Sequence, residues 1–198
     1  MVHNFQLDQQ TINETKEYCD YLYESNRKFG IKDSIIDKNR SGKEINLQGL
    51  GAEVWYKKKY NIPFNLGATK ENLRPRSYKT DIDCIREGLN LELKQTSYFR
   101  GCLFLSATDH YSKPRKLLAD MYVLIVGSFP NYEKDLHVSL LSITKKFFVK
   151  ESNMLKPTKH SRMKSVGYHM EQDEMHETFE KALEANGNPR TKDTSAVS

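Results

Sequence analysis

The alternation of apolar and polar residues between positions 89 and 96 constrains the fold most strongly, because it fixes which side chains share a face of an extended segment. The apolar residues are Leu89, Leu91 and Leu93. The polar residues that alternate with them are Asn90, Glu92, Lys94 and Thr96. Residues 79–85 alternate in the same way, and the glycine of Arg86-Glu87-Gly88 suits a turn. We therefore expect a hairpin with one packed face and one charged face.

Such a hairpin would bring Asp83 close to Glu92. Two neighbouring carboxylates repel one another unless one is protonated or a cation lies between them. Mg²⁺ binds oxygen ligands, often from only one or two carboxylates, and keeps waters and substrate phosphate in its shell. Lys94, on the same face as Glu92, could then orient a metal-bound water or neutralise charge on phosphate. The alternative is an ordinary hairpin with one wet face, on which polar side chains are expected.

A helix is predicted over residues 46–56, upstream of the hairpin. Its apolar residues have helical spacing, and Asn46 is available as an N-cap. Gly49, Gly51 and Ala52 are small enough for the helix to pack closely on a sheet. Glu53 follows them directly, so its carboxylate could lie where the helix approaches the sheet edge. The alternative for Glu53 is a solvent-facing residue beside the basic run Lys57–Lys59.

In that order, Glu53 on the helix, Asp83, and then Glu92-Leu93-Lys94 resemble the PD-(D/E)XK nuclease superfamily. The resemblance covers about residues 46–145. It implies an α/β fold with a restriction-endonuclease-like core, in which helices flank a mixed central β-sheet. It also implies that Asp83, Glu92 and Glu53 are metal ligands and that Lys94 is the catalytic lysine.

The acid differs in one respect from the superfamily signature. No proline precedes Asp83, which follows Ile82, and Asp81 has the facing to compete for the ligand role. The resemblance nevertheless implies a Mg²⁺-dependent endonuclease, with Mn²⁺ as a substitute ion, that hydrolyses DNA by nicking it or by cutting branched structures. The chain looks closest to small stand-alone nucleases of phages and other mobile elements. A non-catalytic nucleic-acid-binding module on the same fold, an RNA endonuclease and a homodimer stay open.

Basic residues outside the hairpin are expected to contact DNA phosphates. The most basic stretch, residues 145–164, contains Glu151 as its single acid. Such a segment can contact phosphates without reading sequence, although a solvated loop is the alternative. The expected contacts are Lys113, Arg115, Lys145, Lys146, Lys156, Lys159 and Arg162.

Composition agrees with one intracellular domain. The 198 residues, 37% of them hydrophobic, can bury one core, and the formal charge of +5 mildly favours polyanions. We expect a single domain over residues 1–185 and a disordered tail over residues 186–198. The sequence has no apolar run of eighteen residues and no signal-peptide pattern, which predicts a cytoplasmic protein with no membrane partner. The cytoplasm of an infected host cell is included in this expectation. The three cysteines form no CxxC pair, which indicates free thiols.

The remaining pattern predicts further elements. Residues 8–28 read as a helix, residues 30–45 and 61–79 as loops, and residues 102–105 as a third strand. Residues 114–118 can start a short helix, since proline suits the first turn. A strand buried on both faces is predicted over residues 120–126, followed by a further strand or pair over residues 136–148. The chain then predicts an acidic amphipathic helix over residues 172–185. No histidine pair has the spacing typical of a zinc site.

Overall fold

The computed structural model describes residues 5–28, 30, 40–64, 66, 82–106, 116–146 and 167–185. The helices are α1 (Gln9–Lys28), α2 (Gly42–Lys59), α4 (Leu140–Lys146) and α6 (Phe179–Glu184), with a 3-10 turn η1 (Gln172–Glu174). The strands are β1 (Cys84–Arg86), β2 (Leu89–Thr96), β3 (Leu103–Ser106), β4 (Met121–Ser128), β5 (Asn131–Ser139) and β6 (Gly167–Met170).

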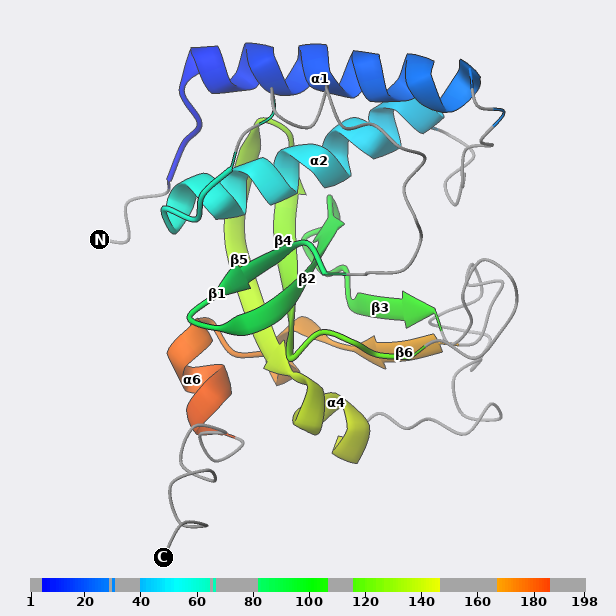
Figure 1. Cartoon of the computed structure of the whole chain (residues 1–198). Helices are drawn as coiled ribbons and strands as arrows, with labels where there is room; N and C mark the ends of the chain where they lie inside the picture. Colours follow the sequence, from blue (N-terminus) through cyan, green and yellow to red (C-terminus); the bar gives the residue numbers. More distant parts are fainter. Residues whose placement is uncertain are drawn as a thin grey trace, which may run out of the picture.

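A four-stranded mixed sheet in the order β1-β2-β4-β5 forms the centre of the molecule (Figure 1). β2 is antiparallel to β1 and parallel to β4, and β4 is antiparallel to β5. The chain turns from β1 into β2 at Glu87 and Gly88, whose φ angles of 51° and 81° suit a two-residue hairpin. The expected mixed α/β class, with helices against a mixed central sheet, is confirmed at this level.

α2 covers one face of the central sheet, and α1 lies over α2 (Figure 1). The core on this face includes Leu91 and Leu93 of β2 and Trp55 and Tyr56 of α2. The expected close approach of a glycine occurs at Gly51, where a Cβ atom would meet the Phe129 ring and the Tyr132 hydroxyl.

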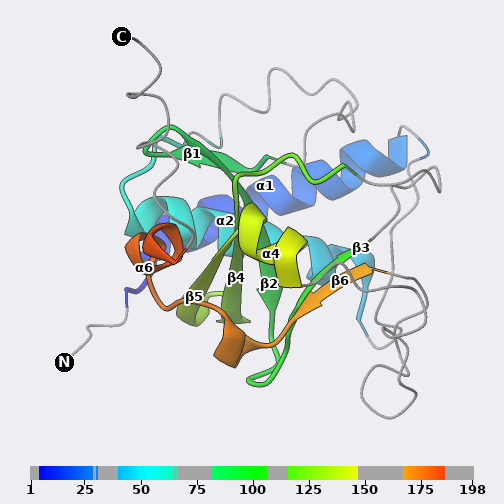
Figure 2. The same ribbon diagram turned by 90° about the horizontal axis from the view of Figure 1, so that it is seen from below.

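The opposite face of the central sheet packs against the two-stranded sheet formed by β3 and β6 and against α4 (Figure 2). The residues of this second core include Leu103, Leu105, Tyr122, Leu124, Val126, Ile143 and Met170. The central strand β4 is therefore buried on both sides, as its apolar run predicted. The alternative of an ordinary hairpin with one wet face does not hold at Glu92, whose side chain is only 1% exposed.

α1 follows the prediction closely. It begins after Asp8, whose carboxylate accepts a hydrogen bond from the backbone N–H of Thr11 at 2.7 Å. Tyr18 and Cys19 lie in the core, whereas Tyr21 is 39% exposed. Cys19, Cys84 and Cys102 are free thiols, as the sequence indicated.

The predicted start of α2 is wrong. Ser41 is the N-cap, its hydroxyl accepts from the backbone N–H of Glu44, and the Glu44 carboxylate accepts from the backbone N–H of Ser41. This reciprocal pair is a capping box, which places the N-cap five residues before the expected Asn46. Residues 42–45 are consequently helical, although they were expected to belong to a loop.

Three later elements differ from the expected ones. The strand expected at 102–105 exists as β3, but it pairs with β6 outside the central sheet. The strand expected over 136–148 begins earlier, at Asn131, and ends at Ser139, where α4 follows. The helix expected over 172–185 consists of η1, an isolated bridge at His176 and the shorter α6.

Residues 116–119 lie outside any helix or strand. The short helix expected at 114–118 is therefore wrong over residues 116–118, the part that the structure describes. Leu117 packs against the second core and Ala119 is fully buried, which favours an extended path into β4. The loop expected at 67–79 and the tail expected at 186–198 lie outside the described residues. Over the described ranges, no helix has the length and apolar character needed to cross a membrane.

Candidate functional site

Glu92 and Lys94 project from β2 toward the side of the sheet that β3 and β6 cover. In the parallel register Glu92 pairs with Tyr122 and Lys94 with Leu124, and both partners belong to the second core. The Glu92 side chain is only 1% exposed and forms an ion pair with Lys94, whose side chain is 34% exposed. Lys94 thus connects a buried carboxylate with the surface.

Asp83 directly precedes the first residue of β1 and lies against β2. Its backbone N–H donates to the Leu91 carbonyl at 2.8 Å, and its carboxylate accepts from the backbone N–H of Leu93 at 2.7 Å. Leu93 is the residue between Glu92 and Lys94. The structure therefore brings Asp83 against the Glu92-Leu93-Lys94 triplet, through its carboxylate at the Leu93 N–H.

Glu53 does not join Asp83 and Glu92. It lies on α2, which covers the opposite face of the sheet, and its carboxylate is 3.6 Å from the Lys57 ammonium. Burial raises the pKa of the nearby Cys84 thiol to about 11, and the charges of Asp83 and Glu53 act in the same direction. Glu53 is thus near the start of the hairpin but engages a lysine of its own helix.

The donor set suits a hard cation with few protein ligands. Among the described residues, no three His, Cys, Asp or Glu side chains are grouped closely enough to hold a metal ion. Mg²⁺ is often bound by one or two carboxylates together with waters and substrate phosphates. Asp83 and Glu92 are the two carboxylates that would supply such ligands, and Glu92 would have to exchange its ion pair with Lys94 for the cation. Glu53 does not join them as a third ligand among the described residues.

Most of the basic residues expected to bind DNA lie outside the described residues. Lys145 and Lys146 are the last residues of α4, and only their backbone is described. The predicted contacts outside the described ranges are Lys113, Arg115, Lys156, Lys159 and Arg162, and the competing acid Asp81 is outside them as well.

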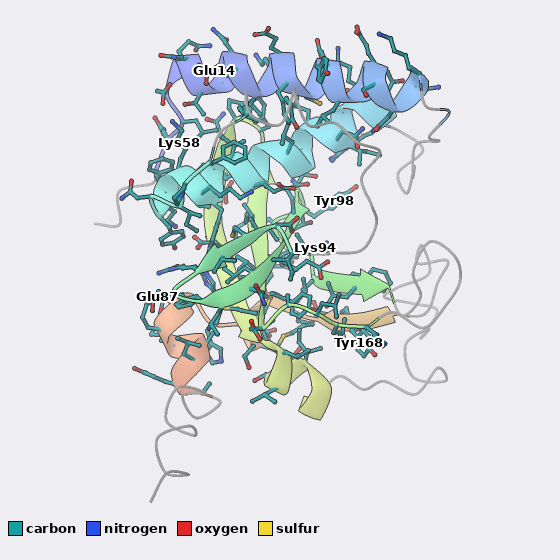
Figure 3. The ribbon with its side chains drawn as sticks, in the orientation of Figure 1. Glu14, Lys58, Glu87, Lys94, Tyr98 and Tyr168 are labelled. Atoms are coloured by element: carbon teal, nitrogen blue, oxygen red, sulfur yellow. The ribbon has the colours of Figure 1, made fainter. Side chains whose placement is uncertain are left out.

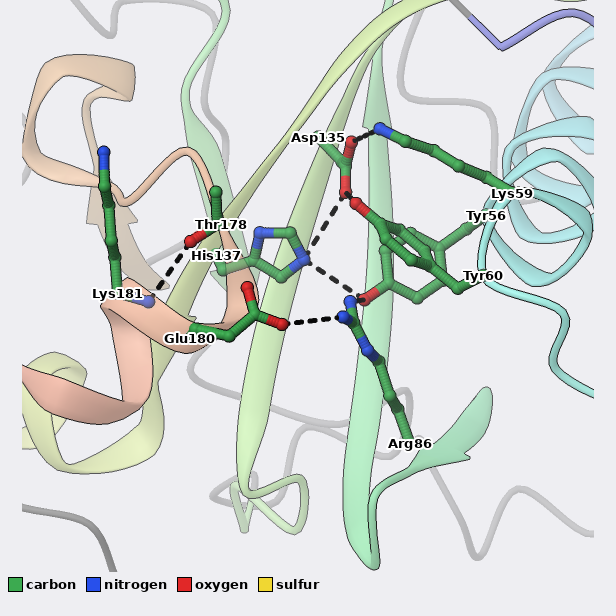
Figure 4. Close-up of polar contacts among 9 residues, drawn as sticks. All are labelled: Tyr56, Lys59, Tyr60, Arg86, Asp135, His137, Thr178, Glu180 and Lys181. Atoms are coloured by element: carbon green, nitrogen blue, oxygen red, sulfur yellow. Dashed lines mark hydrogen bonds and ion pairs between the residues drawn. The ribbon is translucent and has the colours of Figure 1, made fainter.

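A second polar cluster, on the α2 face of the sheet, was not predicted (Figure 4). His137 of β5 is fully buried, and its Nε2 lies 3.1 Å from the Tyr56 hydroxyl and 3.5 Å from Asp135 Oδ2. The Asp135 carboxylate accepts from the Tyr60 hydroxyl at 2.6 Å and pairs with Lys59. Because Asp135 is 4% exposed, this arrangement is an internal network rather than an open site.

Arg86, at the end of β1, joins this network to the C-terminal segment. It donates to the Tyr56 hydroxyl at 3.3 Å and to the Glu180 carboxylate at 3.0 Å. Its guanidinium carbon lies 4.0 Å from the Tyr60 ring centroid and 4.2 Å from that of Phe179. The guanidinium is thus packed between two aromatic rings, an arrangement that stabilises a partly buried cation.

Burial lowers the pKa of His137 to about 4, against an opposing effect of the Asp135 charge, so the imidazole is neutral at neutral pH. Burial also raises the pKa of Tyr56 and Tyr60 above the ordinary tyrosine range. The network therefore contains neutral His137, Tyr56 and Tyr60 beside a charged Lys59–Asp135 pair. A sequence signal exists in retrospect, because Asp135 and His137 share one strand face and Tyr56 and Tyr60 share one helix face.

Comparisons with known proteins give no relative from which a function could be transferred. No protein-family model matches the chain, and neither the curated proteins nor the solved structures contain a significant match.

Proposed function

We propose that the chain is a Mg²⁺-dependent endonuclease that acts on DNA and has a restriction-endonuclease-like core of the PD-(D/E)XK type. The observation that carries the proposal is the hydrogen bond from the backbone N–H of Leu93 to the Asp83 carboxylate. It joins the hairpin acid to the Glu-x-Lys triplet.

The order of elements also supports the proposal. A helix with Glu53 comes first, the hairpin β1–β2 follows, and β4 then lies parallel to β2 after a crossover. This is the order that the resemblance implies. The departure is Glu53, which pairs with Lys57, so the proposal assigns metal binding to Asp83 and Glu92 alone.

Asp83 and Glu92 would hold the ion, and when bound it would supply Lewis-acid chemistry at a phosphodiester. Lys94 would leave its pairing with Glu92 and turn its ammonium toward phosphate oxygens, where negative charge develops during hydrolysis. Its side chain is 34% exposed, whereas that of Glu92 is 1% exposed, so the departure of Lys94 would also open Glu92 to the ion. The hydrogen bond from Leu93 fixes the position of the Asp83 carboxylate before substrate arrives.

A non-catalytic DNA-binding module on the same fold is the second candidate. The ion pair between Lys94 and Glu92 favours it, because the pair satisfies both charges without a metal. The two candidates differ in turnover, so an activity measurement separates them.

The test is cleavage of supercoiled plasmid, linear duplex, branched DNA and RNA, each with Mg²⁺ and with chelator. We expect Mg²⁺-dependent cleavage of DNA, which Asp83→Asn and Glu92→Gln abolish and Lys94→Met slows by about a hundredfold, as expected for the loss of one preorganised electrostatic group. Glu133→Gln is the matched control, since Glu133 is an exposed acid on β5. Cleavage that survives chelation, or that both acid variants retain, contradicts the metal site.

A further inference from the structure

Two aromatic side chains are displayed to solvent directly after the Glu-x-Lys strand. Tyr98 is 59% exposed and Phe99 is 70% exposed. Both belong to the turn Ser97–Gly101, hereafter the aromatic turn, which links β2 to β3. Exposed single apolar residues are common on proteins, but two adjacent rings beside a candidate active site are a specific surface for a flat ligand.

The aromatic turn is held in place by several hydrogen bonds. Ser97 Oγ accepts from Arg40 at 2.6 Å, and the backbone N–H of Gly101 donates to the Tyr98 carbonyl at 2.8 Å. The Gly101 carbonyl accepts from the Gln172 amide at 2.6 Å. The two rings are therefore presented by an ordered backbone, which lowers the entropy cost of binding a partner.

The side chains around the aromatic turn suit a base with its phosphate. The Lys134 ammonium lies 5.4 Å from the Phe99 ring centroid, and Arg100 is exposed next to that ring. Phe99, Arg100 and Lys134 line a groove of about 760 Å³ together with residues of the C-terminal segment, among them Glu171, Asp173, Glu177 and Lys181. The cations favour phosphate on the side of the aromatic turn, and carboxylates can accept from the exocyclic amine of a base.

The position of the aromatic turn relates it to the candidate active site. Tyr98 is four residues beyond Lys94, and Figure 3 shows both near the end of β2. At about 3.3 Å per extended residue, the two residues are at most about 13 Å apart, roughly four steps of a stacked strand. A strand bound at Lys94 would need to span no more than about this distance to reach the aromatic turn.

We propose that the aromatic turn binds unpaired bases of a DNA strand, which directs the chain to junctions between single-stranded and duplex DNA. The inference rests on the proposed function for its use in cleavage but not for binding itself. Stacking on Tyr98 and Phe99 supplies affinity for any base, because every base has a flat face. Paired bases inside a duplex are stacked on their neighbours and cannot use these rings.

The experiment measures binding in chelator, so that no cleavage is required. Fluorescence anisotropy compares an oligothymidylate of about 15 nucleotides with a duplex of equal length. We expect the double variant Tyr98→Ala/Phe99→Ala to lose roughly five- to a hundredfold in affinity for the single strand, with duplex affinity unchanged. The conservative pair Tyr98→Phe/Phe99→Tyr should keep single-strand affinity within about twofold. Ile85→Ala is the control, because Ile85 is 60% exposed and lies outside the aromatic turn.

The proposal is overturned if the double variant loses affinity equally for single strand and duplex, or loses affinity for neither. Concentration-dependent self-association that the double variant abolishes also overturns it, since a second copy of the chain would then occupy the surface. The proposed nuclease function can fail separately. If the wild-type chain does not cleave DNA but the double variant still loses single-strand affinity as predicted, the binding site stands and only the cleavage is contradicted.

Discussion

At the scale of single residues, the ion pair between Glu92 and Lys94 is asymmetric. The Glu92 side chain is 1% exposed, whereas that of Lys94 is 34% exposed. Removing one partner of a buried pair is costly when the charge left behind cannot reach water. The lysine can turn toward solvent, and the glutamate cannot.

This asymmetry predicts unequal losses of stability. Lys94→Met should lower the free energy of unfolding by about 2 to 3 kcal/mol, because it leaves a buried carboxylate without its cation. Glu92→Gln should cost about 1 kcal/mol or less, since the freed ammonium is solvated. Urea unfolding of both variants and of the double variant measures the coupling. A larger loss for Glu92→Gln would contradict the buried position of its carboxylate.

At the scale of elements, the contact between α2 and the turn that joins β4 to β5 depends on Gly51. The Tyr132 hydroxyl donates to the Gln48 carbonyl at 2.9 Å, and the backbone N–H of Phe129 donates to the Gln48 side chain at 2.8 Å. Both rings thus lie directly against the helix backbone. A methyl group at Gly51 would meet them, whereas Gly49 on the same helix has nothing within 4 Å.

The two glycines should therefore respond in opposite directions to alanine. Gly49→Ala should raise the free energy of unfolding by about 0.5 to 1 kcal/mol through helix propensity alone. Gly51→Ala should lower it by about 1 to 3 kcal/mol, because overpacking exceeds that gain. Thermal unfolding of both variants, with Gly49→Ala as the internal control, measures the difference. If both alanines stabilise the protein, the close approach at Gly51 is not rigid.

At the scale of the whole molecule, the buried network joins four elements that are distant in sequence. α2 contributes Tyr56, Lys59 and Tyr60, and the residues from the other elements are Arg86, Asp135, His137 and Glu180. No atom in the described part of the chain pairs with His137 Nδ1. His137 Nδ1 thus has no hydrogen-bond partner among the described residues, whichever nitrogen of the imidazole carries the proton.

The network predicts acid sensitivity. Burial lowers the pKa of His137 to about 4, the positive charges of Arg86 and Lys59 act in the same direction, and Asp135 and Glu180 oppose them. The unfolded chain, with an ordinary histidine pKa near 6.5, binds a proton more readily between about pH 6.5 and 4. The contribution of neutral His137 to stability is therefore complete above about pH 6.5 and is lost as the pH falls through about 4.

The measurement compares wild type with His137→Gln by urea unfolding near neutral pH and near about pH 4.5. Wild type should lose more stability on acidification, by up to about 3 kcal/mol, because each tenfold change in proton affinity is about 1.4 kcal/mol. The variant removes this one titration and keeps the others. Equal losses for the two proteins would mean that the imidazole is solvated.

Local sequence patterns predicted those core positions and strands that are determined by residues close together in the sequence. The leucine alternation placed Leu91 and Leu93 in the core, and the apolar run predicted the buried β4. The start of α2 was readable as well, since Ser41 and Glu44 have the capping-box spacing, but Asn46 was preferred. The functions of Asp83, Glu92 and Lys94 stay predictions, although the structure brings the three residues together.

Contacts between distant segments could not be predicted in this way. The side of the hairpin that carries Glu92 faces the second core, to which β3, β4 and β6 contribute, so the burial of Glu92 does not follow from the hairpin alone. The contacts of His137 with Tyr56 and of Asp135 with Tyr60 join residues 81 and 75 positions apart, which local alternation does not predict. A polar residue on a strand is assigned to solvent unless its partner is known.

The bridge between His137 and His176 has a further consequence for β5, which is an edge strand of the central sheet. The backbone N–H of each histidine donates to the carbonyl of the other, at 2.7 and 2.9 Å. Edge strands with free amides are templates on which other chains can add strands and aggregate. Since the C-terminal segment pairs with this edge at His137 from within the same molecule, it limits strand addition at that point of β5.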